Sequence, residues 1–586
     1  MSRANLATPG TKQAWLLPQL DPVRTAELSA AAAIPPLIAE LLLDRGVNTA
    51  EEALRFLNPK LDHLLDPYSM HGMAAAVARV QAAIRNHEPI LIYGDYDVDG
   101  TTAVVLLKTA IERLGGEVRF HVPHRLLEGY GMQGSVLETS FAEGVRLVIS
   151  IDTGMRAFAE AIVAERLGLD LIVTDHHLPD AALELPRALA ILNPNQPDCG
   201  YECKHLCGAG VAFKLAQALL EAEDRERTRT KILPSFLKML VLATVADSVP
   251  LLGENRVIAS LGLMELQRPV GTGLRALMAE AKLDPSKRPL NTVDIGFRLA
   301  PRINAAGRMD VASEVVELFT TRDPGRAKDL AEKLERLNTD RKQTELAALE
   351  EIEHKLADDA SLREARLIVL DGVDWHRGVI GILASRVVDR TARPAIVIAV
   401  EDGIGYGSGR SVPGFHLLQA IESCAEIFTR FGGHAHAIGF ALPADRIQNL
   451  RNRLAEYALT NIEAGLPVRT IECHGFLALE NITPGFYTWL RQLEPFGMCN
   501  PEPIFIAKNI SLAAPPKILK ERHIRLTLAQ GPKGKNMAAL GWNWAERVAQ
   551  LELEQGSTIN IAYRLRQNEN PNFSGLELEI AGLERA

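Results

Sequence analysis

Acidic and histidine side chains follow four apolar segments of this chain. The first segment, LIYGDYDVDG, ends in three aspartates whose carboxylates repel one another unless a positive charge lies among them. LVISIDTG ends in one aspartate, LIVTDHH in an aspartate and two histidines, and LVLATVADSVP contains a further aspartate. The side chains are those of Asp95, Asp97, Asp99, Asp152, Asp175, His176, His177 and Asp247.

Carboxylates and imidazoles without thiolates suit a hard or borderline divalent cation, such as Mn²⁺ or Mg²⁺. The number of carboxylates predicts two ions. Two ions about 4 Å apart clamp the attacking and leaving oxygens of a phosphoryl displacement, and a bridging water can become the hydroxide nucleophile. We therefore expect these residues to form the catalytic site of a phosphoester hydrolase that works by in-line attack without a covalent intermediate.

Taken singly, each motif has an ordinary explanation. An aspartate after a strand usually caps a turn or a helix. The DxDxDG pattern is similar to a calcium loop, but Leu106 stands where the EF-hand glutamate would be. Cys199, Cys203 and Cys207 have a spacing unlike the usual zinc pair, so we favour reduced cysteines there. None of these explanations accounts for the same arrangement four times.

The elements that must position these residues alternate between strands and helices. The runs PILIYGD, EVRFHVPHR, VRLVISIDTG, LDLIVTDHH and ALAILNPNQ are separated by helical patterns such as TTAVVLLKTAIERLGG. This alternation predicts a parallel, doubly wound α/β sheet. Ligands bind beyond the carboxyl ends of the strands in such sheets, so the first three motifs are expected to converge.

At 586 residues the chain is too long for one hydrophobic core. We expect a mostly helical region over 1–70, the α/β catalytic domain over 71–323 and a charged connecting helix over 324–360. A solvated helix with no linking role is the alternative for 324–360. A second, smaller α/β domain is expected over 361–463. The alternating strands of 464–586 predict a small β-barrel similar to an OB-fold.

Net charge and hydropathy exclude some classes of protein. The net charge of −9 argues against a generally basic nucleic-acid binder, although a local basic groove remains compatible with it. No run of about 18 apolar residues occurs, and the N-terminus lacks an apolar signal-peptide core. We expect a cytoplasmic monomer that does not bind membranes.

The motif order DYDVDG, IDTG, TDHH and ATVADSVPL resembles the DHH phosphoesterases, and within them the exonucleases specific for single-stranded DNA. CGAGVAFKLAQAL, RINAAGRM, WHRGVIGILASR, GSGRS, FGGHAHAIGF and EPFGMCNPEPIF extend the resemblance over nearly the whole chain. FGGHAHAIGF is similar to the core of the DHHA1 domain that accompanies DHH domains. The chain departs from the family at Val98, where alanine is common, and at Cys499, where glycine is expected.

The resemblance implies roles for individual residues. It assigns metal ligation to Asp152, His176, Asp247 and the aspartates of DYDVDG, with their division between the ions left open. Some relatives have a histidine at the position of Tyr93, and Asp95 looks like its substitute. Asp175 would orient an imidazole, and His177 would contact the scissile phosphate or donate a proton.

Candidates for DNA and phosphate binding lie outside the four motifs. Arginine forks match phosphate oxygens, and backbone near glycine approaches an anion closely. The resemblance favours Arg125, Arg302 and Arg410 as contacts to a 5′-terminal phosphate, while surface or packing roles are the alternative. RINAAGRM is expected to form a turn-like loop. The other candidates are Asn304, Arg308, His376, Ser408, Ser411, His434, His436, Lys517, Lys520, Arg522 and Arg525, with Lys533 and Lys535 in the same basic segment.

The activity implied by the resemblance is 5′ to 3′ digestion of single-stranded DNA to 5′-mononucleotides in recombination and repair. A helicase and a single-strand-binding protein are the implied partners. One alternative is a DHH-family phosphodiesterase that cleaves short oligonucleotides or cyclic dinucleotides, although its relatives are usually shorter. The other is a non-catalytic single-strand-binding scaffold, although such proteins lose metal ligands and every expected ligand is present here.

Overall fold

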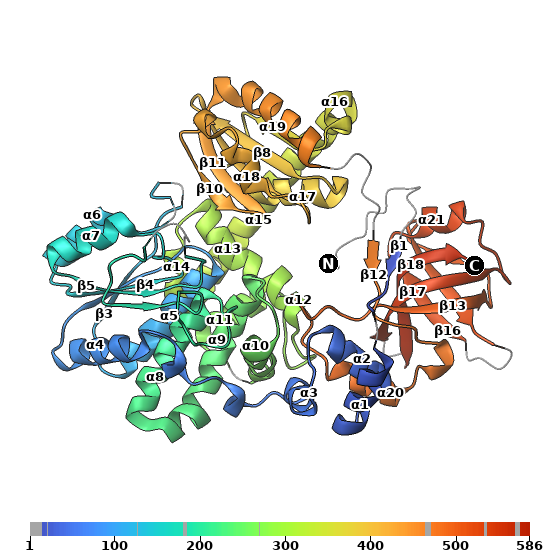
Figure 1. Ribbon diagram of the computed structural model, residues 1–586, viewed down its shortest axis with the longest axis horizontal. Helices are drawn as coiled ribbons and strands as arrows, with labels where there is room; N and C mark the ends of the chain where they lie inside the picture. The colour runs from blue at the N-terminus through green and yellow to red at the C-terminus, as the bar shows by residue number, and fades with distance from the viewer. Residues whose placement is uncertain are drawn as a thin grey trace.

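A computed structural model describes residues 14–19, 21–125, 127–129, 131–179, 184–268, 270–462, 470–531, 536–568 and 575–586. It consists of a parallel-sheet domain, a long helix, a second sheet domain and a C-terminal barrel (Figure 1). The α/β class, the connecting helix and the barrel predicted from the sequence are all confirmed.

The first domain is built on five parallel strands in the order β3-β2-β4-β5-β6. The central strands β2 and β4 are buried along their whole length, which explains why they are continuously apolar. The strands are β2 (Ile90–Tyr93), β3 (Val118–His121), β4 (Leu147–Ile151), β5 (Asp170–Thr174) and β6 (Ala190–Leu192).

Helices cover both faces of this sheet, as a doubly wound fold requires (Figure 1). One core contains apolar side chains of α4 (Met73–Arg85), α5 (Val98–Arg113) and α8 (Gly208–Arg227). The core on the other face contains side chains of α6 (Gly134–Ala142) and α7 (Phe158–Leu167).

A helical layer completes the first domain and shares a core with the start of the long helix. It is formed by α9 (Leu233–Ala246), α10 (Gly253–Glu265), α11 (Thr272–Glu280), α12 (Thr292–Asp294), α13 (Ala300–Met309) and α14 (Ser313–Thr320). RINAAGRM belongs to α13, so the expectation of a turn-like loop there is wrong. A proline near the start and apolar residues at helical spacing make this segment helical.

The long helix α15 (Pro324–Asp358) links the first domain to the second. Asp323 caps its start by accepting the Gly325 amide, and Pro324 occupies the first helical position. Its first half packs on the helical layer, and residues from Ala348 onward pack on the second domain. The solvated alternative for this helix is therefore wrong.

The second domain contains a mixed sheet in the order β10-β11-β9-β8-β7. Its strands are β7 (Ile368–Gly372), β8 (Ala395–Glu401), β9 (Ile404–Arg410), β10 (Arg430–His434) and β11 (Ala437–Pro443). Its helices are α16 (Ala360–Glu364), α17 (Ile380–Thr391), α18 (Leu417–Glu422) and α19 (Ile447–Asn461).

The barrel follows a short helix, α20 (Pro484–Arg491), and has the strand order β13-β17-β18-β16-β15-β14. A further pairing of β13 with β15 closes it. The elements are β13 (Phe505–Leu512), β14 (Lys517–Leu519), β15 (His523–Ala529), β16 (Met537–Gly541), α21 (Ala545–Gln550), β17 (Thr558–Gln567) and β18 (Leu576–Arg585). Cys499, in the segment before the barrel, has a φ of 56°, a left-handed conformation that explains why glycine is expected there.

The N-terminal helices share one core with the barrel rather than forming a core of their own. They are α1 (Pro22–Ala32), α2 (Pro36–Asp44) and α3 (Ala50–Leu57). The short strand β1 (Ala14–Leu16) also pairs with β12 (Thr470–Glu472), just before the barrel. Within the described residues no single helix could span a membrane. Only α1 and α2 taken together have the required length and composition, and they are bent by 112° and packed in this core.

Arg256 joins the first domain to this combined N-terminal and barrel unit. Its side chain is 1% exposed and stacks 3.6 Å from the Phe56 ring centre. The guanidinium donates hydrogen bonds to four carbonyl oxygens, those of Phe56, Gln492, Leu493 and Glu494. A single buried cation therefore fixes α10, the end of α3 and the segment before the barrel.

Replacement of Arg256 by methionine should lower stability by at least about 3 kcal/mol, because buried carbonyls lose their donors. We expect a lower melting temperature and faster limited proteolysis between the first domain and the barrel. Arg268→Met is the control, because the Arg268 side chain is 63% exposed and forms an ion pair with neighbouring Glu265. Equal melting temperatures for Arg256→Met and wild type would contradict this role.

Candidate metal centre

The carboxyl ends of three neighbouring strands bring the sequence motifs together. The DYDVDG loop follows β2, Asp152 follows β4, and Asp175 and His176 follow β5. Asp247 reaches the same place from the C-terminal end of α9. Ligand atoms within 4.8 Å of one another form three groups: Asp95, Asp97 and Asp152; Asp99, His176 and Asp247; and Asp152, His176 and His177.

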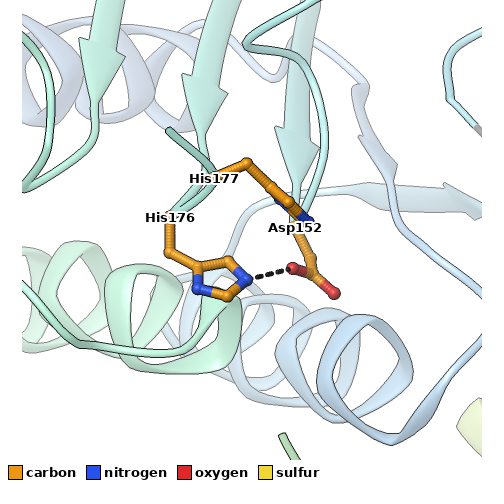
Figure 2. Close-up of side chains that lie close together, drawn as sticks. All are labelled: Asp152, His176 and His177. Atoms are coloured by element: carbon orange, nitrogen blue, oxygen red, sulfur yellow. Dashed lines mark ion pairs between the residues drawn. The ribbon is translucent and has the colours of Figure 1, made fainter. Parts of the chain in front are cut away.

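His176 lies at the centre of this acidic cluster. Its Nε2 is 3.2 Å from Asp152 Oδ1 and 4.0 Å from Asp99 Oδ2, and its Nδ1 is 3.9 Å from Asp247 Oδ2. Figure 2 shows the His176 ring and the Asp152 carboxylate pointing toward each other from adjacent strand ends. Burial lowers the pKa of His176, so the imidazole is neutral at pH 7, the form that binds metals.

Helix N-termini hold two of the three aspartates of the DYDVDG loop. Asp97 is the N-cap of α5 and accepts the Gly100 amide at 3.0 Å. Asp99 accepts the Gly208 and Ala209 amides at 2.6 and 2.8 Å, at the start of α8. These amides and the helix dipole stabilise its negative charge. The CGAG sequence therefore anchors a carboxylate of a motif more than one hundred residues earlier in the chain.

Backbone geometry is tight where the loops meet. Asp152 has a φ of 58°, a left-handed conformation that is rare for a non-glycine residue and common at functional sites. Gly100 has no room for a side chain, because a Cβ would lie 2.6 Å from the Asp95 carbonyl oxygen. The loop is therefore held in one conformation.

Electrostatics in the cluster call for added positive charge. Burial, and then repulsion from neighbouring aspartates, raises the pKa of Asp95 and Asp152 well above the usual value. The same two causes raise the pKa of Asp247 to about 9. Burial raises the pKa of Asp99 as well. Asp95 Oδ1 is buried and has no hydrogen-bond partner among the described residues. A neutral imidazole among oxygen donors fits a divalent cation such as Mn²⁺ or Mg²⁺.

Asp175 and His177 form a pair beside the cluster. Asp175 is buried and accepts hydrogen bonds from the Met155, His176 and His177 amides. His177 Nδ1 lies 2.7 Å from Asp175 Oδ1. Burial alone would lower the pKa of His177, but the bond to Asp175 and its charge raise it to about 9. His177 is therefore a cation at neutral pH, and its half-exposed ring is positioned to contact an anion.

Tyr93 is separated from the cluster. Its side chain is fully buried, its hydroxyl donates to the Gly131 carbonyl at 3.2 Å, and its ring lies 5.0 Å from His121. Asp95, two residues later, is the nearby oxygen donor of this loop. This placement is compatible with the interpretation that Asp95 replaces a histidine found in relatives.

A cavity of about 360 Å³ opens above the cluster and has acidic and basic walls. The cluster forms the acidic part of its wall, and Arg125, Asn304, Arg308 and Tyr96 also line it. The Arg125 guanidinium lies 5.1 Å from the Tyr96 ring centre. Burial, and then repulsion from Arg125, Arg341 and Arg410, lowers the pKa of Arg308 to about 10. Like-charged guanidiniums this close indicate an anion-binding wall.

Other candidates from the first and second domains have hydrogen-bond or ion-pair partners within the protein. Arg302 is buried, pairs with Glu335 of α15 and donates to the Arg298 carbonyl, so it ties α13 to α15. Asn304 Oδ1 accepts the Val98 amide at 3.1 Å, although Asn304 also lines the cavity. Arg410 Nη1 lies 3.1 Å from Ser408 Oγ, whereas the Ser411 hydroxyl donates to the Phe415 carbonyl.

Two candidate histidines and three tryptophans also have defined surroundings. His434 and His436 are exposed and lie with ring centres 6.3 Å apart. Trp375 is a packing residue, 3% exposed, with its indole N–H bound to Glu351. Trp544 is buried, whereas Trp542 is 46% exposed beside His523.

The basic candidates of the barrel lie on and beside the β14–β15 hairpin, away from the metal cluster. The Lys517 position is opposite Arg525 across the strand pair, and the hairpin turn contains Lys520 and Arg522. Lys533 and Lys535 lie outside the described residues. Cys199, Cys203 and Cys207 are absent from every group of possible metal ligands found among the described residues.

The sequence alone does not predict the surroundings of two residues, Tyr96 and Arg341. Tyr96 lies between two conspicuous aspartates, and nothing in its type reveals that it stacks with Arg125. Arg341 lies within a long run of charged residues on α15, and its type does not reveal that it is buried, paired with Glu345 and close enough to Arg308 to lower the pKa of that residue. Only the three-dimensional structure distinguishes Arg341 from the neighbouring charged residues of α15.

Replacement of Asp152 by asparagine should stabilise the metal-free protein by roughly 1 kcal/mol, because one of several mutually repelling buried carboxylates is removed. The variant should lose most of the rise in melting temperature that Mn²⁺ gives the wild type. Asp170→Asn, at the other end of the neighbouring strand β5, should keep the full response to Mn²⁺. A normal Mn²⁺ response of Asp152→Asn would contradict the assignment.

Comparison with known proteins agrees with the order of the domains. The DHH family N-terminal domain matches residues 89–244, the DHHA1 domain matches 364–460, and the RecJ OB domain matches 473–582. The chain is 37% identical to the single-stranded-DNA-specific exonuclease RecJ of Bacillus subtilis over 580 residues. That alignment covers 97% of this chain and 70% of the relative.

Solved structures of the same kind contain metal ions. RecJ of Thermus thermophilus in complex with Mn²⁺ is 29% identical and superposes with a TM-score of 0.81, covering 98% of this chain and 80% of that one. The structure of the same protein with Mg²⁺ is 28% identical with a TM-score of 0.74, covering 98% and 78%. Sequence identity over nearly the full length, the three domain matches and the shared fold agree: the chain belongs to the RecJ family, within the DHH family.

Proposed function

We propose that this chain is a divalent-metal-dependent exonuclease that degrades single-stranded DNA from the 5′ end and releases 5′-mononucleotides. The observation that carries the proposal is one cavity with a metal-binding acidic wall and an arginine wall. Metal ions on the acidic wall would hold the phosphate that is cleaved, while the arginines would hold a neighbouring phosphate of the same strand. The Bacillus subtilis and Thermus thermophilus proteins are RecJ proteins, and the former is named as an exonuclease specific for single-stranded DNA.

The metal site would be formed by Asp97, Asp99, Asp152, His176 and Asp247, with Asp95 completing the set. When two divalent cations are bound there, they supply Lewis-acid stabilisation of the phosphoryl oxygens and a nucleophile at neutral pH. The protein's own contribution is to fix the carboxylates before the substrate arrives, through the helix N-termini of α5 and α8.

Cationic side chains orient the substrate. The protonated His177, held by Asp175, can donate a hydrogen bond or a proton to an oxygen of the scissile phosphate. Arg125 and Arg308 line the cavity, and Arg410 is close enough for its charge to act on Arg308; together they would receive the 5′-terminal phosphate. Capture of a terminal phosphate at a fixed distance from the cleavage point explains exonucleolytic release of single nucleotides.

The barrel extends the binding path for longer strands. Lys517, Lys520, Arg522 and Arg525 surround the β14–β15 hairpin and attract the phosphate backbone. Trp542 is exposed next to His523, with ring centres 5.0 Å apart, and can stack on a base. Its exposure favours contact with DNA over packing in the core.

The proposal extends to the cellular setting. Because its substrate is DNA, the enzyme would act where the chromosome lies, which is the cytoplasm in the bacterial relatives. A helicase would supply single strands for recombination and repair, and a single-strand-binding protein would present them. We propose that one chain suffices, because the metal cluster, the arginine wall and the barrel all come from the same chain.

Two other functions are less well supported. A phosphodiesterase of short oligonucleotides would have no need for the barrel, and rate against substrate length separates it from an exonuclease. A non-catalytic scaffold would not need to keep six carboxylate and imidazole ligands within one cluster.

Digestion of single strands labelled at either end tests the proposal. In Mn²⁺ or Mg²⁺ the wild type should release labelled mononucleotide from the 5′ end at once and from the 3′ end last. EDTA should abolish the reaction, and Asp97→Ala should lower the rate by at least about 100-fold. Full activity of Asp97→Ala, or early release of the 3′ label, would overturn the proposal.

Arg410→Ala should raise KM for 5′-phosphorylated strands about tenfold, because a charge-assisted phosphate contact contributes roughly 1.5 kcal/mol or more. The KM for strands with a 5′-hydroxyl should change much less. Arg453→Ala, a half-exposed arginine of the same domain paired with Glu426, is the control. An equal KM increase on both substrates would remove Arg410 from the 5′-phosphate site.

A further inference from the structure

The last turn of α13 lies directly against the loop that carries Asp95, Asp97 and Asp99. A Cβ added at Gly307 would be 2.4 Å from the Tyr96 carbonyl oxygen, closer than real Cβ atoms come to any atom. One turn earlier, Asn304 Oδ1 accepts the Val98 amide at 3.1 Å. Helix α13 therefore contacts the loop on both sides of Asp97.

The opposite side of the same turn touches the second domain. A Cβ at Gly378 would lie 2.5 Å from the Arg308 carbonyl oxygen and 2.9 Å from His376 Nδ1. Arg308 is one of the last residues of α13, where carbonyls have no partner within the helix. The two domains therefore meet backbone to backbone, one residue away from the contact with Tyr96.

The turn of the second domain that makes this contact is held rigidly. His376 Nδ1 accepts the Gly378 amide at 3.0 Å, which closes the turn. The preceding Trp375 is buried and bound through its indole to Glu351 of α15. If the second domain moved, this rigid turn would move with it and would displace the Arg308 carbonyl.

We propose that Gly307 and Gly378 are positioning residues, and that the last turn of α13 couples the seating of the second domain to the geometry of the metal loop. The carboxylates of the loop then reach their binding arrangement only when the second domain is seated on Arg308. Arg410 lies on the same domain and contacts the substrate, so bound DNA favours the seated position of that domain. DNA binding and metal binding therefore strengthen each other.

The inference rests on the proposed function only in that the acidic cluster binds a divalent cation. Its alternative is that both glycines merely allow local packing. In that case a change at Gly378, which is outside the metal cluster, would alter DNA binding but leave the affinity for metal unchanged. Metal affinity measured without DNA therefore separates the two interpretations.

The experiment titrates Mn²⁺ into DNA-free protein and follows the dissociation constant by calorimetry and by melting temperature. Gly307→Ala and Gly378→Ala should each weaken Mn²⁺ binding about tenfold, within the usual range for coupled sites. Gly296→Ala and Gly439→Ala are matched controls, because a Cβ there meets nothing closer than 3.9 and 4.0 Å. Both should bind Mn²⁺ as the wild type does.

His376 provides a second, independent pair of variants should a glycine variant fail to fold. His376→Ala opens the turn and should weaken Mn²⁺ binding, whereas His376→Asn keeps an acceptor for the Gly378 amide and should restore it. The inference is overturned if Gly378→Ala binds Mn²⁺ as tightly as wild type and only the KM for DNA rises. If Gly378→Ala does not fold, the same result for His376→Ala overturns it. Absence of Mn²⁺ binding in the wild type would instead refute the proposed function.

Discussion

Repulsion among buried carboxylates is the constraint on which the rest of this structure depends. Five aspartates from three sequence motifs are buried or half-buried around the histidine of a fourth motif, and burial and their mutual repulsion raise the pKa of most of them. The protein counters this repulsion with backbone amides at the starts of α5 and α8 and with the cation His177. These partial charges fix the carboxylates in place without neutralising them, which leaves the cluster ready for metal ions.

Acidic and basic side chains line the same cavity. Strand ends of the parallel sheet and the end of α9 supply the acids, whereas the segment after β3 and helix α13 supply Arg125 and Arg308. If the guanidiniums touched the aspartates, salt bridges would satisfy both and neither metal nor phosphate would bind. The long helix α15 carries the second domain, whose Arg410 is close enough to Arg125 for the two charges to interact.

The sequence could predict most of the fold and the acidic wall, because periodicity marks the strands and a parallel sheet forces their ends to one edge. It could not assign the two arginines of RINAAGRM. The resemblance favoured Arg302 for the 5′-terminal phosphate and left Arg308 as a further candidate in a loop. In the helix the two point about 120° apart, since each residue adds about 100°. Arg308 faces the cavity, and Arg302 faces Glu335. The partner of Asn304 and the exposure of Trp542 depend likewise on contacts between segments far apart in sequence.

The shared core of α1–α3 and the barrel has a consequence for how the chain folds during synthesis. The N-terminal helices leave the ribosome first, yet their apolar faces are covered by strands that follow roughly 450 residues later. At about 5–20 residues per second, those faces wait for tens of seconds while the parallel-sheet domain forms between them. During this interval the apolar faces of the helices stay exposed, so the core that they share with the barrel forms only after the barrel strands have been made.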